Sequence, residues 1–516
     1  MALKFLPALI LILFLLAFLA PALALFNEGM SSFRSLSSTM SEDIFLTYGQ
    51  TSLLLVVGSV CGALLFGLSA AYLCARFDFL MRRQLLWLSL LPLAVPSYLV
   101  TYTWVDVLVD QGVRGGALRT LPATCIVFAL CLSPYIFLPT YAALTSMSRS
   151  VIESAQLLGK NRWEIFFRIE LPIIRSSLFA GSALVGMEVL ADFGTVDFMA
   201  IDTWSTGIFR SWFGYGDREK ASALALVLFS ASGLVLFWQT SVSGQKSVAD
   251  SVRISSQYPR QKAAFFKLLP MFLLTLLPPL LSCLFPAAIL LNKALFDFSK
   301  NHWLEVFPAA FTSLWIAVLT SSVVVILGLL FVLILRSNTW SLFRVLARLG
   351  TLGYAFPGGV LGLGLLILLA PFSLTGSLIG LVYAYCIRFA TIGSSTIEAA
   401  WRQIPNGYYE QARVLGCTKQ SAFLRVTLPI LRKSIACAFV LTCIDVVKEL
   451  PATMLLRPFN FETLALRTYT LASDERLSET APSSFLMIVL SLIGIFAAEK
   501  MGAFGVSKGS LPVKND

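Results

Sequence analysis

Histidine and charged side chains are scarce in this sequence. Of its 516 residues only one is a histidine, His302, and 13% are charged, whereas about a quarter of an ordinary soluble domain is charged. A soluble core also stops growing at about 250 to 300 residues, and longer chains then divide into domains with polar surfaces. The scarcity of charge therefore excludes an ordinary soluble enzyme. A single histidine also leaves almost nothing for a histidine-based triad or zinc site.

Two sequence patterns that would indicate other chemistry are absent. The nine cysteines form no CxxC pair, so no disulfide framework is predicted. No G-x-x-x-x-G-K-[ST] phosphate loop occurs, so the chain cannot supply an ATP site. We expect no catalytic residue, no bound metal and no cofactor in this chain.

Long apolar runs are what the sequence has in abundance. Hydrophobic residues make up 57% of it, and a bilayer core about 30 Å thick needs roughly 20 apolar residues per helix. We therefore predict an all-α polytopic membrane protein with about twelve transmembrane helices. Their approximate spans are 5–26, 50–75, 85–109, 121–147, 176–196, 221–241, 265–291, 308–335, 344–370, 374–397, 434–455 and 480–498. The first run imitates a secretory signal with Ala22-Leu23-Ala24, but its length favours a retained helix.

Lysine and arginine gather in alternate loops between these runs. The net charge is +11, and in a membrane protein such an excess marks cytoplasmic loops that face anionic lipid. The basic loops include Arg82, Arg168, Arg260 and Arg425, whereas the intervening loops are mixed or acidic. We predict that both termini are cytoplasmic, with membrane lipid as a partner and no nucleic acid.

An internal repeat divides the chain into two halves. Glu153-Ser-Ala-Gln-Leu-Leu-Gly159 matches Glu410-Gln-Ala-Arg-Val-Leu-Gly416 at a spacing of 410 − 153 = 257 residues, which is almost half of 516. The same spacing relates the Leu-Pro pairs that follow. We predict a first transmembrane half at 1–241, a cytoplasmic linker at 242–264 and a second half at 265–516. In each loop a glycine is expected to end a short helix whose small residues allow close approach, and a proline to open the next helical segment.

The doubled E-x-A-x-x-x-G pattern, with Leu-Pro thirteen residues after the glycine, resembles the cytoplasmic EAA loop of binding-protein-dependent ABC importer permeases. Ser154 departs from it, where the family commonly has a second alanine. The resemblance implies a fused, type I permease of the bacterial inner membrane. Its partners would be homodimeric ATP-binding cassette subunits, which hydrolyse ATP, and a periplasmic or extracellular substrate-binding protein. The residues that would couple to the ATPase are Glu153, Ala155, Gly159, Leu171, Pro172, Glu410, Ala412, Gly416, Leu428 and Pro429.

Acidic residues follow each loop inside predicted helices. Their i, i+4 spacing places each pair on one helix face, and ionisable groups inside a membrane are functional candidates by default. Parallel repeats would bring equivalent helices together across one path. The predicted pathway or gate residues are Glu188, Asp192, Arg210, Asp445, Lys448, Glu449 and Arg467. The alternative is structural pairing, with Lys448 neutralising Asp445 or Glu449 and the two arginines clamping the outer ends.

The stretches around these acids, such as Ala191-Asp-Phe-Gly-Thr195 and Lys448-Glu-Leu-Pro-Ala-Thr453, look like those of the fused iron(III) permeases. This resemblance implies a ferric substrate. Those permeases are also similar to fused thiamine and phosphonate-type permeases, and the carboxylates would suit ferric iron and cationic thiamine alike. A secondary, major-facilitator-like transporter would also have twelve helices in two parallel repeats, but it has no reason to duplicate this loop.

Overall fold

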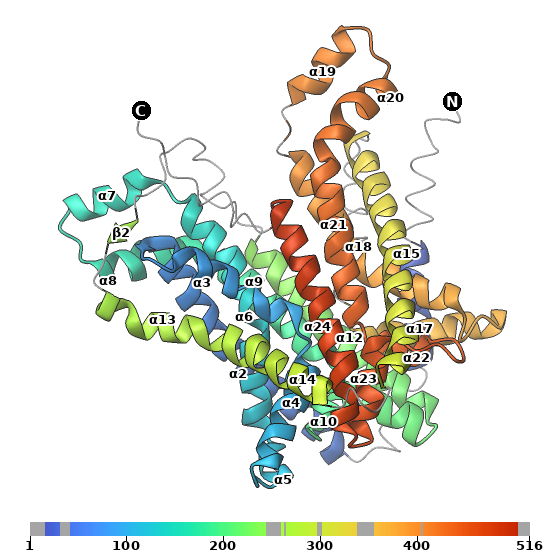
Figure 1. Ribbon diagram of the computed structural model, residues 1–516. Coiled ribbons are helices and arrows are strands. Elements are labelled where there is room, and N and C mark those ends of the chain that lie inside the picture. The colour runs from blue at the N-terminus through green and yellow to red at the C-terminus, as the bar shows by residue number, and fades with distance from the viewer. Residues whose placement is uncertain are drawn as a thin grey trace. The chain divides into compact units, whose positions relative to one another are not determined.

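The computed structural model describes residues 16–30, 42–243, 260–262, 265–296, 302–337, 356–402, 404 and 406–503 (Figure 1). Nearly all of these residues are helical, and the single sheet among them consists of two two-residue strands, β1 (Phe77–Asp78) and β2 (Gln261–Lys262), paired in parallel. The predicted all-α class is confirmed. Most of the predicted linker and the outer parts of the 5–26 and 344–370 runs lie outside the described residues.

Eight described helices are long and apolar enough to cross a membrane. They are Ile44–Arg76, Leu121–Ser146, Arg162–Ala191, Arg218–Gln239, Phe266–Leu295, Trp303–Ile334, Leu378–Arg402 and Ser478–Lys500. Two shorter apolar helices, Leu16–Met30 and Gly358–Phe372, accompany them. Each of the twelve predicted runs overlaps a described helix, so the chain is a multi-pass membrane protein.

One predicted helix, 85–109, is sharply bent. The segments Arg82–Ala94 and Ser97–Asp110 meet at 91°. Val95 between them has an extended backbone, with φ −112° and ψ 121°. It precedes Pro96, and a residue before proline is pushed out of the helical region because its backbone would collide with the proline ring. A hydropathy pattern predicts the apolar run but does not reveal this break in the helix.

By its internal contacts the chain falls into two compact units that are not continuous in sequence. One comprises residues 33–299 and 471–488. Its main elements are α2 (Glu42–Arg76), α3 (Arg82–Leu88), η1 (Leu91–Ala94), α4 (Ser97–Asp110), α5 (Gly115–Leu118), α6 (Leu121–Ser146), α7 (Arg149–Leu157), α8 (Arg162–Ile165), η2 (Phe166–Glu170), α9 (Leu171–Ala191), α10 (Gly194–Phe198), α11 (Trp204–Phe209), η3 (Arg210–Gly214), α12 (Arg218–Ser243), α13 (Phe265–Pro279), η5 (Leu280–Leu284) and α14 (Phe285–Phe296).

The other unit comprises residues 1–32, 300–470 and 489–516. Its main elements are Leu16–Met30, α15 (His302–Ser337), α17 (Gly358–Leu369), η8 (Ala370–Phe372), α18 (Leu378–Arg402), α19 (Asn406–Val414), α20 (Lys419–Ala422), η9 (Phe423–Thr427), α21 (Leu428–Lys448) and α22 (Pro451–Leu456). The boundary between the units crosses α23 (Leu464–Ser473) and α24 (Leu477–Lys500).

The helices that open the two sequence halves are exchanged between these units. In the unit built mainly from the first half, the Trp104 ring of α4 stacks on Phe285 of α14 at 4.7 Å, and Trp104 Nε1 donates to the Leu281 carbonyl at 2.8 Å. In the unit built mainly from the second half, Phe18 meets Phe356 edge to face at 5.8 Å. Each unit therefore contains the opening helix of the other sequence half.

Glycines allow the central helices of each unit to approach closely. A Cβ added at Gly62 in α2 would lie 2.5 Å from the Ala129 Cβ of α6. A Cβ at Gly328 in α15 would lie 3.0 Å from the Gly393 carbonyl carbon of α18. Lipid tails are as apolar as leucine, so membrane helices depend on this kind of backbone proximity for packing energy. These pairs form the frame from which the loops and helix breaks project.

Candidate coupling loops and pathway residues

The first coupling loop, residues 149–172, contains the predicted short helix, α7. Ile152 and Ala155 are buried against Ile165. The helix ends in a Schellman arrangement, in which Lys160 N donates to the Ala155 carbonyl at 3.1 Å and Gly159 N to the Gln156 carbonyl at 2.9 Å. Glu153 is half-buried on the same helix. The alanine of the motif thus anchors the helix to its own unit.

The second coupling loop, residues 406–429, repeats this geometry 257 residues later. Ala412 of α19 is 7% exposed. Cys417 N donates to the Ala412 carbonyl at 3.1 Å, and Gly416 N to the Arg413 carbonyl at 3.1 Å. Glu410 lies exposed on the outer side of the helix. Two helices with one ending pattern therefore project from the two units.

Both motif glycines are required by backbone conformation. Gly159 has φ +75° and Gly416 has φ +88°, and a Cβ added at either position meets no atom within 4 Å. An L side chain is disfavoured in this left-handed region, whereas glycine is not. The close approach expected from sequence is therefore not made at these glycines within the described chain.

Each coupling helix presents an apolar pair at its tip. Leu157 and Leu158 are 88% and 78% exposed, and Val414 and Leu415 are 87% and 84% exposed. Full exposure of two adjacent apolar side chains costs free energy in water, and it recurs in both loops. Sequence reasoning missed these residues, although they stand directly before each motif glycine.

A five-residue π-helix precedes each Leu-Pro pair. The segments η2 and η9 lie 257 residues apart and lead directly into α9 and α21. Leu171-Pro172 and Leu428-Pro429 occupy the first turn of those helices. The helix does not begin anew there, because Leu171 N donates to the Phe166 carbonyl and Leu428 N to the Phe423 carbonyl. The π-turn therefore leads straight into a proline, which has no N–H to donate. π-Turns inside helices are frequent at functional sites, and nothing in the sequence pattern signalled them.

The predicted acidic face is interrupted in both units, because α9 ends at Ala191 and α21 ends at Lys448. Asp192 and Glu449 have extended backbones, with ψ 133° and 118°. The carboxylate of each residue accepts a hydrogen bond from the first turn of the next short helix, α10 or α22. Asp192 accepts hydrogen bonds from Thr195 N at 2.8 Å and from Ser97 Oγ at 2.7 Å. The i, i+4 spacing therefore does not give one continuous helix face, and these two carboxylates cap helices.

Glu449 has a cationic partner that its first-half equivalent does not display. Its Oε2 lies 2.9 Å from Arg388 Nε, and the two side chains are 4% and 13% exposed. Its Oε1 accepts a hydrogen bond from Ala452 N at 3.2 Å. Lys448 instead pairs with Asp445 at 3.1 Å. Of the two partners expected for Lys448, the structure places it on Asp445.

The two arginines are paired away from Asp192 and Glu449. Arg210 donates to Asp202 at 2.8 Å. Burial opposes the charge of Arg210, but this hydrogen bond, together with Tyr48, leaves the pKa of its guanidinium raised. Arg467 pairs with Glu305 at 2.9 Å and with Glu462 at 3.2 Å. Each arginine thus forms ion pairs with residues of its own unit.

Arg388, Ser97, Asp202 and Glu305 are among the partners that sequence reasoning missed. A charged residue in the middle of the 374–397 run was a usable signal for Arg388, because such residues usually have a polar partner. Within the described ranges no group of three or more histidine, cysteine, aspartate or glutamate side chains could hold a metal ion. Of the predicted pathway residues, Arg210, Asp445, Lys448, Glu449 and Arg467 are ion-paired, and Asp192 and Glu449 accept hydrogen bonds from the next short helix.

Comparison with known families gives two matches, one in each half of the internal repeat. The family model of the binding-protein-dependent transport system inner membrane component matches residues 63–245 and again residues 325–501. The chain belongs to this permease family. The two matches contain the two coupling loops, so the internal duplication is a duplication of the family's domain, and the chain is a fused, two-half permease.

Relatives of this permease differ in what their names say they transport. The Fe(3+)-transport system permease protein FbpB 2 of Haemophilus influenzae is 24% identical over 87% of this chain and 88% of its own length. The sulfate transport system permease protein CysT of Escherichia coli is 28% identical over 38% of this chain and 74% of its own length. The spermidine/putrescine permease PotB of Haemophilus influenzae is 28% identical over 26% and 52%. Similarity to the iron permease extends through both halves of this chain.

Proposed function

We propose that this permease forms the translocation pathway of an ATP-driven importer for ferric iron. The observation that carries the proposal is the similarity of both halves, in one chain, to an Fe(3+)-transport permease. The sulfate and polyamine relatives match at most about two fifths of the chain, which is what a shared loop and helix frame would produce. The iron, thiamine and phosphonate alternatives differ in the solute alone, so a substrate assay separates them.

The apolar tips of α7 and α19 support a docking role for the two loops. In this proposal Leu157-Leu158 and Val414-Leu415 enter grooves on two identical ATPase subunits, and the Leu-Pro segments transmit the motion into α9 and α21. ATP is hydrolysed in those partner chains, and a separate binding protein delivers the solute on the opposite side. The excess of lysine and arginine in alternate loops supports a cytoplasmic position for the coupling helices and both termini.

The carboxylates at the two helix breaks are proposed to border the pathway. Glu188, Asp192 and Asp445 are half-buried, and Glu449 is buried, and Asp192 and Glu449 stand at the points where α9 and α21 end. Buried carboxylates keep their charge only with partners or water. The contacts of Asp192 and Glu449 favour a gate or structural function for these two. Glu188 and Asp445, each four residues before its helix break, are proposed to meet the solute, and Asp445 does so together with Lys448, its partner at 3.1 Å.

Reconstitution tests the substrate. The permease, its ATPase and its binding protein are placed in liposomes, and ATP-dependent uptake is measured with binding protein loaded with Fe(III), thiamine, sulfate or a phosphonate. Uptake of iron alone is expected. Uptake of another solute with none of iron would refute the ferric assignment and leave the importer intact, whereas proton-driven uptake without the ATPase would refute the importer itself.

Neutralisation tests the pathway. The Glu188→Gln/Asp445→Asn double variant should lose at least tenfold in uptake while it retains membrane abundance and ATPase co-purification. A control pair in the coupling loops, Glu153→Gln/Glu410→Gln, separates pathway charge from docking, because it should affect co-purification instead. Normal uptake by the first variant would exclude a required charge at these positions.

A further inference from the structure

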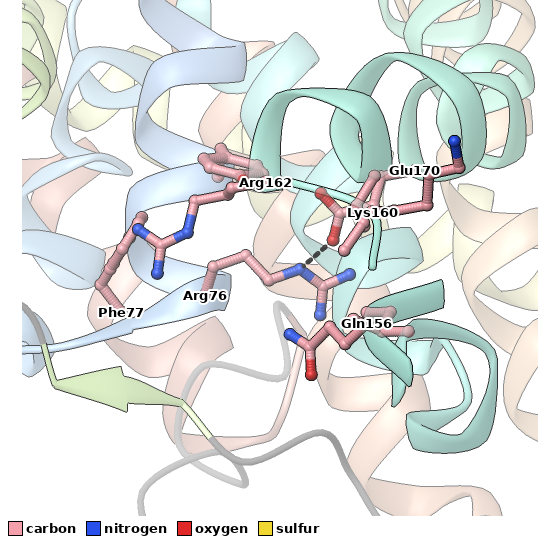
Figure 2. Close-up of a pocket in the computed structure, with 9 residues that line it drawn as sticks. Arg76, Phe77, Gln156, Lys160, Arg162 and Glu170 are labelled. Carbon is pink, nitrogen blue, oxygen red and sulfur yellow. Dashed lines mark ion pairs between the residues drawn. The ribbon is translucent and has the colours of Figure 1, made fainter. Parts of the chain in front are cut away.

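The first coupling loop encloses a polar cavity that docking and transport do not explain. Its volume is about 180 Å³, and its wall is formed by the end of α2, by α7 and by the segment from Lys160 to Glu170 (Figure 2). The lining side chains are Tyr72, Arg76, Phe77, Ile152, Gln156, Lys160, Arg162, Ile165 and Glu170. The cavity therefore lies between the coupling helix and the membrane helix that supports it.

The charge of this lining is unbalanced. Three cations, Arg76, Lys160 and Arg162, face one carboxylate, Glu170. Glu170 is 2% exposed, and its Oε1 lies 2.6 Å from Arg76 Nε, as the dashed line in Figure 2 marks. This pair accounts for one positive and one negative charge, which leaves two cations on the wall.

Each of the two remaining cations has a weak partner. Lys160 lies 3.3 Å from Glu164 on the surface, where an ion pair contributes little. The guanidinium of Arg162 lies 5.0 Å from the centre of the Phe77 ring, toward which it points in Figure 2. Both side chains are exposed enough to reorient. An anion entering the cavity would gain charge-assisted hydrogen bonds from flexible donors.

The volume restricts the size of the ligand. About six water molecules would fill 180 Å³ at roughly 30 Å³ each, and drug-sized ligands occupy pockets of about 300 to 1,000 Å³. A phosphate-sized oxyanion with a few waters fits this space, and a whole nucleotide does not. Phosphate groups are also what arginine and lysine bind best in combination.

The second coupling loop lacks the buried ion pair of this lining. Residues 257 later are Leu333 for Arg76 and Thr427 for Glu170, whereas Lys160 corresponds to Cys417 and Arg162 to Lys419. Leu333 and Phe423 pack there in an apolar cluster around Leu431 and Trp401, and the Trp401 and Phe423 rings stack at 5.8 Å. A coupling loop can thus be supported without a buried ion pair behind it, so coupling alone does not account for the ion pair and cavity of the first loop.

We propose that this cavity is a binding site for a phosphate-sized oxyanion, which bridges α7 to the end of α2 and stiffens the first coupling loop. Two sources share the chemistry. One is a free anion such as inorganic phosphate, and the other is the phosphate of an anionic lipid headgroup, which the end of a membrane helix can reach.

Binding is tested on the purified full chain, so the result does not depend on the transported solute. Thermal unfolding is followed with increasing inorganic phosphate, against chloride at equal ionic strength. In a second arm it is followed in nanodiscs of phosphatidylglycerol or phosphatidylcholine. The test variant is Lys160→Gln/Arg162→Gln, whose side chains are exposed and outside the buried ion pair. The matched control, Arg425→Gln/Lys433→Gln, removes the same two charges from the second loop and its first helical turns.

Saturable stabilisation by phosphate, weakened at least tenfold in the test variant and unchanged in the control, is the expected result. Stabilisation by phosphatidylglycerol alone, with the same dependence on Lys160 and Arg162, would also support the site and assign the oxyanion to lipid. Absence of saturable stabilisation in both arms would overturn the proposal. An equal loss in the control would do so too, because it would show general charge attraction.

Discussion

Replacement of Arg388 by methionine tests whether the buried pair with Glu449 holds the second helix break together. The substitution keeps the length of the side chain but leaves the Glu449 carboxylate, which is 4% exposed, facing an apolar group. Breaking a buried pair from one side costs about 3–5 kcal/mol, because the remaining charge stays desolvated. The unfolding equilibrium should therefore shift by about two to four powers of ten.

The double variant Arg388→Met/Glu449→Gln should recover most of this loss. Glutamine leaves no isolated charge and still presents an oxygen to Ala452 N, the backbone group that Glu449 now caps at 3.2 Å. Removing both partners of a buried pair is often close to neutral. We expect the double variant to be more stable than Arg388→Met by at least about 2 kcal/mol, a coupling that only an interacting pair produces.

The chain's own cysteines provide the assay. All nine are free, and Cys386 and Cys437 are buried in the unit that contains the pair, so a thiol-reactive dye reports their exposure on unfolding in detergent. A surface pair, Glu398 with Arg402 at 2.6 Å, serves as control. Glu398→Gln should cost less than about 1 kcal/mol. If Arg388→Met is no worse than this control, or if the two substitutions simply add, the pair does not hold the break together.

Three further outcomes follow from other contacts. Gly159→Asn should keep ATPase co-purification better than Gly159→Val, because asparagine tolerates the left-handed backbone that costs other residues about 1–2 kcal/mol; equal loss would refute the conformational explanation. Lys293→Met should lower stability by about 1–2 kcal/mol, because Lys293 of α14 pairs with Asp106 of α4, and an unchanged unfolding temperature would contradict this. An impermeant thiol reagent applied to cells should label Asp217→Cys and miss Lys160→Cys, and the reverse would invert the topology.

The loops were readable from sequence because their determinants are local. A short helix, a left-handed glycine and a proline in a first helical turn each depend on a few neighbouring residues. Repetition of these determinants after 257 residues made them visible in a single chain. The structure has α7 and α19 at this spacing, and it has the π-turns there as well. The membrane runs were equally accessible, since hydrophobic length is set by the bilayer.

The helix breaks were not readable in the same way, because their partners are distant in sequence. Ser97 is 95 residues from Asp192, and Arg388 is 61 residues before Glu449. The i, i+4 spacing of the acids suggested a continuous face, and no local rule says that α9 and α21 end between them. The bend at Pro96 lies within a uniformly apolar run, and only the proline marked it.

The two helix breaks have similar backbone conformations but differ in the charged groups around them. Asp192 is held by a hydroxyl and a backbone amide, which stabilise a carboxylate without cancelling its charge, whereas Glu449 meets a guanidinium and Asp445 meets Lys448. The negative charge of the second break is thus largely balanced within its own unit. If these breaks border the solute's path, attraction for a cation arises mainly at the first break. A duplicated chain can assign the two halves such different tasks, because each copy of a fused repeat can change independently of the other.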